Sequence, residues 1–203
     1  MISVECRVTS DECRVMSDKS LKLCYRFGSR LAVALGLALL PALAQACTEL
    51  LNHRYTSLQG KLVNLCDYAG RPVLVVNTAS KCGYTPQFEK LEALHKRYQG
   101  RGLVVLGFPS NDFNQELATN KEIAQFCKLT YFVEFPMVEQ GAVSGPRANA
   151  FFRQLAAAAG SAPQWNFHKY LIDPDGRTVH GFGSQVEPDS REIMGRLLPM
   201  LAK

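Results

Sequence analysis

The sequence has little of what marks nucleic-acid-binding and membrane-spanning proteins. Its 203 residues carry a net charge of +5, and no basic run of five or more residues occurs. Residues 1–46 hold six Lys/Arg and four Asp/Glu, which leaves only +3 for residues 47–203. The apolar run Leu31–Leu40 is ten residues long, whereas a membrane-spanning helix needs about 20. We therefore expect no nucleic-acid partner and no stable membrane association.

Residues 1–46 have the organisation of an export leader. Lysine and arginine between residues 22 and 30 precede the apolar run, and Ala44-Gln45-Ala46 provides a small-x-small cleavage pattern. We predict a signal peptide cleaved after Ala46 and export, to the periplasm if the source is bacterial. A lipid-modified Cys47 is the alternative. Residues 1–15 precede the leader proper and are interpreted as a start assigned too early, with Met16 the more usual beginning.

Removing the leader leaves four of the seven cysteines, at positions 47, 66, 82 and 127. In an oxidising compartment, four cysteines could simply form two structural disulfides. Local context argues for a different division. Cys66 follows a predicted strand, and we expect it to contribute to packing, whereas Cys47 at the mature terminus is expected to be disordered.

The order of predicted strands and helices indicates one α/β domain over residues 47–203, without repeats or low-complexity segments. Pro72–Asn77 and Leu103–Phe108 are continuous apolar runs, typical of buried strands. The helix between them, which is predicted to begin at Pro86, makes the two strands a parallel pair. The other predicted elements are a strand at Leu62–Leu65, a helix with Thr119 and Glu122 as a capping box, a short strand at 135–138, a helix at Ala148–Ala159, a hairpin of Lys169–Asp173 and Thr178–Phe182, and a last helix at Ser190–Leu201, bent at Pro199. This is the order of the thioredoxin architecture, with a central mixed sheet flanked by helices.

Cys82 stands between a buried strand and the start of a helix. The free amides of the helix terminus, its dipole and the neighbouring Lys81 all favour a thiolate at this position. Half of a structural disulfide is the competing interpretation. Two familiar thiol patterns do not fit. The second cysteine of a dithiol exchange motif is replaced by Thr85, and the threonine of Pro-x-x-x-Thr-x-x-Cys is replaced by Ala79.

Three separated blocks resemble the glutathione peroxidase family, over a region from about Tyr55 to the end of the chain. They are Val76–Leu94 (VNTASKCGYTPQFEKLEAL), Val104–Glu116 (VVLGFPSNDFNQE) and Trp165-Asn166-Phe167. The resemblance implies a peroxidase in which Cys82 replaces the selenocysteine of some members, with Gln115, Trp165 and Asn166 completing the catalytic site.

One departure from the family pattern affects Gln115. Family members commonly carry two glycines before this glutamine, whereas the loop here is one residue shorter and has Asn114 instead. Asn114 can adopt the left-handed backbone that glycine would allow, so the loop can still deliver Gln115. The indole N–H of Trp165 and the amides of Gln115 and Asn166 are hydrogen-bond donors. Gathered at the sulfur, they would stabilise both a thiolate and the negative charge that develops on the departing oxygen.

Cys127 occupies the position of the resolving cysteine in thioredoxin-dependent family members. The resemblance implies that peroxide oxidises Cys82 to a sulfenic acid, which then condenses with Cys127. A thioredoxin-like dithiol is expected to reduce that bond in preference to glutathione, with no cofactor or metal required. The alternative is that Cys127 is a buried apolar cysteine on the face of Ile123 and Phe126. The short stretch Gly160–Gln164 favours a monomer.

Two other functions fit the same residues. A redox sensor would use the disulfide to pass oxidation from peroxide to a partner protein instead of turning over. A purely structural domain would have its cysteines paired from the time of export.

Overall fold

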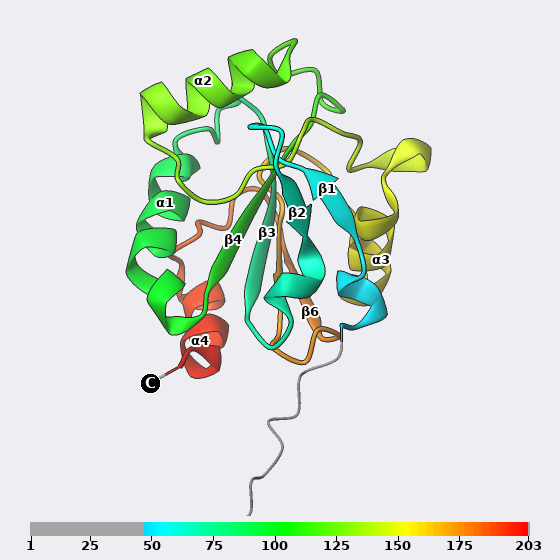
Figure 1. Cartoon of the computed structure of the whole chain (residues 1–203), viewed down its shortest axis with the longest axis vertical. Coiled ribbons are helices and arrows are strands. Elements are labelled where there is room, and N and C mark those ends of the chain that lie inside the picture. The colour runs from blue at the N-terminus through cyan, green and yellow to red at the C-terminus, as the bar shows by residue number, and fades with distance from the viewer. Residues whose placement is uncertain (1–46, 203) are drawn as a thin grey trace, which may run out of the picture. The chain divides into compact units, whose positions relative to one another are not determined.

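A computed structural model describes residues 47–202, so the leader predictions for residues 1–46 lie outside the described residues. Figure 1 shows the arrangement of its helices and strands. In chain order, the elements of this part are η1 (Glu49–Leu51), β1 (Arg54–Thr56), β2 (Leu62–Asn64), η2 (Leu65–Tyr68), β3 (Val73–Thr78), α1 (Gln87–Tyr98), η3 (Gln99–Arg101), β4 (Val104–Pro109), α2 (Asn120–Tyr131), η4 (Gly145–Arg147), α3 (Ala150–Ala159), β5 (Lys169–Ile172), β6 (Val179–Phe182) and α4 (Arg191–Met200).

The central sheet is mixed, as predicted, with the strand order β4-β3-β5-β6 in the described residues. Strands β3 and β4 are parallel, whereas β5 is antiparallel to β3 and pairs with β6 as a hairpin. Residue Val73 at the start of β3 lies opposite Ile172 at the end of β5. The carboxyl ends of β3 and β4 therefore meet at one edge of the sheet, and the β5–β6 turn lies at the other edge.

Helices cover both faces of this sheet, and β3 is therefore buried on both sides. Leu74 and Val76 belong to a core that also holds residues of α1 and α4, whereas Val73 and Val75 pack with α3 and η1. Figure 1 shows α1 and α4 on one side of the sheet and α3 on the other. Burying each of these aliphatic side chains contributes about 1.5–3 kcal/mol, so the strand itself anchors the two layers.

Several predicted boundaries move by one or two residues. Pro86 is the residue before α1 and not its first member. Helix α3 begins at Ala150, because the side chain of Asn149 caps the amide of Phe152. The predicted strand at 135–138 forms only isolated bridges, to Gly107 and Ser57. The capping box at the start of α2 is confirmed, with both of its hydrogen bonds present.

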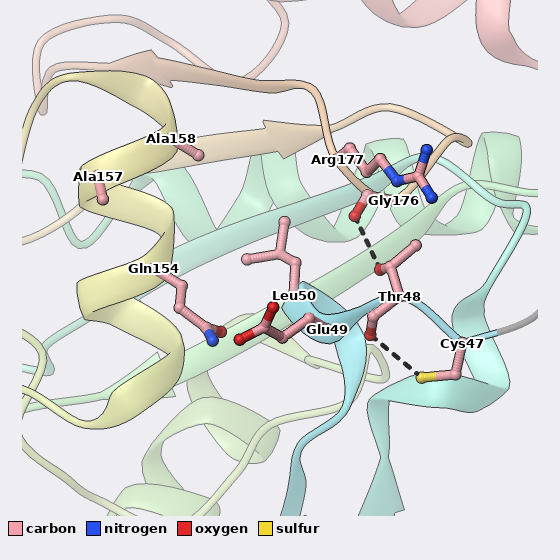
Figure 2. Close-up of a pocket in the computed structure, with 9 residues that line it drawn as sticks. All are labelled: Cys47, Thr48, Glu49, Leu50, Gln154, Ala157, Ala158, Gly176 and Arg177. Carbon is pink, nitrogen blue, oxygen red and sulfur yellow. Dashed lines mark hydrogen bonds between the residues drawn. The ribbon is translucent and has the colours of Figure 1, made fainter.

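The expectations for Cys47 and Cys66 were wrong, since the two form a disulfide. The β1–β2 hairpin returns the chain to its starting point, which brings η2 next to η1 and Cys66 next to Cys47. Figure 2 shows the neighbouring contact, in which the hydroxyl of Thr48 donates to the carbonyl oxygen of Gly176 at 2.8 Å. The segment after Cys47 is therefore fixed against the β5–β6 turn. The sequence did not reveal this disulfide, because the two cysteines come together only when the β1–β2 hairpin forms.

None of the helices found in residues 47–202 has both the length and the apolarity needed to cross a membrane.

Candidate active site

The turn that carries Cys82 lies between the end of β3 and the start of α1, and Thr85 closes it. The hydroxyl of Thr85 accepts a hydrogen bond from the Cys82 amide at 3.0 Å and donates to the Ala79 carbonyl at 2.9 Å. The amide of Thr85 also donates to the Cys82 carbonyl at 3.0 Å. Thr85 therefore replaces the second thiol of a dithiol motif with a hydroxyl that fixes the position of Cys82.

The thiol of Cys82 is free, and the residue is only 8% exposed. The backbone amide of Tyr84 donates to its sulfur at 3.4 Å. Lys81 is exposed beside it. The N–H of Tyr84 is therefore placed to stabilise negative charge that develops on the sulfur during a reaction.

The loop that carries Gln115 is tied to the Cys82 turn by two hydrogen bonds. The amide of Lys81 donates to the Gln115 carbonyl at 2.9 Å, and the amide of Ser80 donates to the Glu116 carboxylate at 3.0 Å. Asn114 adopts the left-handed backbone that the sequence allowed, with a φ of 55°. Burial raises the pKa of Glu116, which the hydrogen bonds from Ser80 partly offset. The shorter loop therefore still reaches the cysteine turn.

Asn166 and Gln115 are joined through their side chains. The amide nitrogen of Asn166, which is fully buried, donates to the Gln115 side-chain oxygen at 2.9 Å. Because that oxygen is occupied, the amide nitrogen of Gln115 is the group left to donate to a ligand. Buried polar partners of this kind lock each other's orientation.

Trp165 is held at the same edge of the sheet by its backbone and its ring. Its carbonyl accepts a hydrogen bond from the side chain of Asn77, the penultimate residue of β3, at 3.2 Å. The residue is 41% exposed, and its ring packs against that of Phe113 with centroids 5.3 Å apart. The structure thus brings the turn of Cys82, the Gln115 loop and the segment of Trp165 and Asn166 together at the carboxyl end of β3.

Cys127 is a free thiol in the interior of α2 and is not bonded to Cys82. It is buried on one helix face with Ile123, and Phe126 packs partly against the same core. Burial raises the pKa of Cys127 to about 12, and the charge of Glu116 adds to the effect. In the folded helix this thiol is therefore protonated and unreactive. Both free cysteines border the core between α1, α2 and the sheet.

Two supporting residues were missed by sequence reasoning, namely Thr85 and Glu116. Both lie inside the blocks that carried the family resemblance, so the signal was present. What their positions alone did not reveal is that a hydroxyl and a carboxylate would act as acceptors for backbone amides of the Cys82 turn. Among the described residues, no group of His, Cys, Asp or Glu side chains could hold a metal ion.

Two cavities deserve comparison. One of about 540 Å³ adjoins the Cys82 turn and is bordered by Tyr84 and Trp165. Another of about 670 Å³ lies between η1, α3 and the β5–β6 turn (Figure 2). None of the predicted site residues lines this larger cavity, whereas Trp165 lines the smaller one. The smaller cavity is therefore the one associated with the candidate site.

The sheet topology and the placement of a cysteine turn at the carboxyl end of β3 define a thioredoxin-like α/β protein. A thioredoxin-family thiol:disulfide interchange protein from Chlorobium tepidum superimposes with a TM-score of 0.53 at 16% identity, which supports the fold alone, and the match covers 73% of this chain and 91% of that one. A crystal structure of Trgpx in apo form gives a TM-score of 0.58 at 30% identity, covering 77% of this chain and 99% of that one.

Sequence comparison narrows the class. Residues 50–156 match the glutathione peroxidase family profile. A glutathione peroxidase of Lactococcus lactis subsp. cremoris is 45% identical over 140 residues, which is 66% of this chain and 89% of that protein. A hydroperoxy fatty acid reductase of Synechocystis sp. is 42% identical over 157 residues, covering 72% of this chain and 93% of that protein. The chain belongs to the glutathione peroxidase family and is a peroxidase that reduces hydroperoxides.

Proposed function

We propose that Cys82 is the peroxide-attacking thiolate of this peroxidase. The thiolate attacks the terminal oxygen of ROOH, the O–O bond breaks, and the alkoxide leaves as ROH after taking up a proton, so that Cys82 becomes a sulfenic acid. The single observation that carries the proposal is the backbone N–H of Tyr84 directed at the Cys82 sulfur, inside a turn closed by Thr85. The free amide nitrogen of Gln115 and the indole N–H of Trp165 are the donors proposed for the leaving oxygen.

Asn166 acts on this chemistry through Gln115. Because its side chain occupies the Gln115 oxygen at 2.9 Å, it presents the donating end of that amide. We expect the loss of one such donor to cost about 10²–10³ in rate, as for other donors that meet a developing oxyanion.

In the second step, Cys127 resolves the sulfenic acid. Its thiolate attacks the Cys82 sulfur, an S–S bond forms, and the hydroxyl leaves as water after protonation. A thiol with a pKa of about 12 contributes almost no thiolate at neutral pH. Unwinding of α2 around Cys127 would both move the sulfur towards Cys82 and remove the burial that keeps it protonated. Opening of the helix is therefore the activating event in this proposal.

A thioredoxin-like dithiol protein would complete the cycle by reducing the Cys82–Cys127 disulfide, leaving its own cysteines oxidised. An internal disulfide is the natural substrate of such a dithiol, because one thiol attacks and the other displaces the mixed disulfide. Glutathione would instead act on the sulfenic acid directly. The protein is proposed to act as a monomer, which sedimentation at micromolar concentration would check.

The test compares peroxide consumption by the wild type, Cys82→Ser and Cys127→Ser, each with thioredoxin plus its reductase and, separately, with glutathione. We expect Cys82→Ser to be inactive throughout, and Cys127→Ser to lose only the activity with thioredoxin while accumulating the sulfenic acid. Replacement of both Cys47 and Cys66 by alanine is the matched control and should keep full turnover.

Two results would contradict the scheme. Full thioredoxin-dependent activity in Cys127→Ser removes the resolving role. A wild type that oxidises once and then stalls with thioredoxin and its reductase supplied favours the sensor, which passes oxidation to a partner protein.

We also propose that the chain is exported and that the mature protein begins at Cys47. The leader pattern supports cleavage after Ala46. The Cys47–Cys66 bond gives further support, because structural disulfides persist mainly in oxidising compartments. A thioether-linked lipid on Cys47 would leave no sulfur for this bond. Intact mass of the protein recovered from the periplasm should match residues 47–203 with one disulfide, whereas an added lipid mass would overturn the assignment.

A further inference from the structure

The cavity of about 540 Å³ beside the Cys82 turn has no role in the steps described so far. Tyr84 connects it to the reacting sulfur, since this residue lines the cavity and its amide contacts Cys82. Trp165 forms part of the same wall. Cys82 itself does not line the cavity, so Tyr84 and Trp165 are the residues through which an organic group lodged there would be placed beside the sulfur.

The cavity wall is uncharged throughout the residues that line it. Besides the two aromatic rings it contains small and polar neutral residues, including Ala162, Ser184 and Gln185. The buried amine of Lys169 donates to the carbonyls of Ser184 and Val186 behind this wall, and it is not among the lining residues. On the far side of Tyr84, the Lys90 ammonium is bound by Glu187 at 3.3 Å and by Asp189 at 3.1 Å. Among the residues that the structure describes, no cation lines the cavity to meet an anionic ligand.

One buried polar atom in the cavity wall lacks a partner. His168 lines the cavity and is only 5% exposed, and its Nε2 has no hydrogen-bond partner among the described residues. Burial lowers the pKa of His168 to about 4, so the ring is neutral at neutral pH. A neutral imidazole offers one hydrogen bond to an uncharged polar group, as donor or acceptor according to its tautomer.

We propose that this cavity seats the organic group of a hydroperoxide and selects bulky, uncharged ones. The proposal rests on the assignment of Cys82 as the peroxide-attacking residue. The apolar organic group of the substrate, bound between Tyr84 and Trp165, would hold the peroxide group at the sulfur. Nε2 of His168 would bind a neutral hydroxyl or carbonyl substituent of the same substrate. A carboxylate placed in the same cavity would lose its hydration without meeting a cation, which is unfavourable. Hydrogen peroxide has no organic group and would gain nothing from the cavity.

The test measures oxidation of the reduced enzyme by stopped-flow fluorescence in the absence of any reductant. Trp165 is the sole tryptophan of the sequence and lies at the site, so it reports the reaction directly. The oxidants are hydrogen peroxide, cumene hydroperoxide and a ring-carboxylated cumene hydroperoxide. Ala162→Phe fills the cavity from an exposed position, and Ala157→Phe is the matched control, an exposed alanine on α3 that lines the other cavity (Figure 2).

We expect Ala162→Phe to slow cumene hydroperoxide about tenfold, a loss typical of a blocked apolar pocket, and to leave hydrogen peroxide within about twofold. The control should change neither. A lysine at the cavity rim, Gln185→Lys, should raise the rate with the carboxylated oxidant severalfold, whereas the neutral Gln185→Met should not.

Equal rates for cumene hydroperoxide in the wild type and Ala162→Phe overturn the proposal, as does equal slowing of both neutral oxidants. If hydrogen peroxide leaves Cys82 of the wild type unoxidised, the assignment of Cys82 itself fails, which is a distinguishable result.

Discussion

Replacing both Cys47 and Cys66 by alanine removes a disulfide that lies far from the proposed chemistry. The register of β3 with β5 sets Val73 opposite Ile172, which places the β5–β6 turn at the amino end of β3. Thr48 contacts Gly176 in that turn, whereas Cys82 follows the carboxyl end of β3. The substitution should therefore change the stability of the domain and leave the reactivity of Cys82 intact.

The expected loss follows from the length of chain that the bond closes. Cys47 and Cys66 are separated by 19 positions in the sequence. In the chain-entropy treatment a closed loop of this size is worth about 3 kcal/mol, because the crosslink restricts the unfolded chain. For a domain of about 150 residues, each kcal/mol corresponds to a shift of about 2–4 °C in Tm, so a decrease of about 6–12 °C is expected.

Urea unfolding followed by circular dichroism measures this loss. The oxidised wild type should unfold at a higher urea concentration than the double variant. Wild-type protein reduced with dithiothreitol should coincide with that variant, which separates the effect of the bond from that of the new side chains. The rate of Cys82 oxidation by hydrogen peroxide should agree within about twofold among all three forms, since the bond lies at the opposite edge of the sheet.

The disulfide would contribute nothing to stability if the oxidised wild type and the double variant shared the same midpoint and slope while intact mass confirmed that the wild-type bond is present. A large fall in Cys82 reactivity in the variant would contradict the separation of the two edges of the sheet.

Three further changes test other parts of the structure. Burial lowers the pKa of His168 from its ordinary 6.5 to about 4, so between these pH values the native state binds fewer protons than the unfolded state. The free energy of unfolding should therefore keep its full value above about pH 6.5 and fall by about 3 kcal/mol as the pH drops to about 4. Urea midpoints measured against pH should show this fall in the wild type and a flatter profile in His168→Gln. Phe132 ends α2 in the left-handed backbone region (φ of 53°), where glycine is unstrained, so Phe132→Gly should stabilise the helix by about 1 kcal/mol. Formation of the Cys82–Cys127 disulfide, followed by a quench-alkylation time course, should slow about fivefold. An unchanged rate would mean that this end of the helix does not open. Asn114→Gly should preserve the rate at which peroxide oxidises Cys82, whereas Asn114→Val should slow it. A β-branched residue is strained at a φ of 55° and would displace Gln115. Equal rates in the two variants would contradict the role of this backbone conformation in positioning Gln115.

Much of the fold could be predicted from the sequence because the decisive signals are local. The apolar runs of β3 and β4 reflect burial on both faces of a sheet, and the connecting helix makes them parallel. The box of Thr119 and Glu122 specifies the start of α2 with residues three positions apart. Segments 54–56 and 135–138 were less predictable, because short pairings depend on which neighbour is available and not on their own pattern.

For the candidate site, too, the local motifs were predictable from the sequence and the spatial arrangement was not. The blocks around Cys82, Gln115 and Trp165 indicated the family, and the match of residues 50–156 to the glutathione peroxidase family confirms it. Their mutual arrangement could not be read from spacing, because Gln115 and Asn166 stand 51 positions apart and meet only where the chain leaves β4 and enters β5 at the same edge of the sheet.

By itself, the sequence determined the fold class, the family and the cysteine turn at the start of a helix, because each depends on short-range patterns of burial, capping and residue type. Only the tertiary structure decided which cysteines pair, that Cys127 is held protonated within α2, and that Gln115 meets Asn166. These features depend on contacts between segments distant in the chain, and such contacts are set by the packing of the whole sheet and its helices.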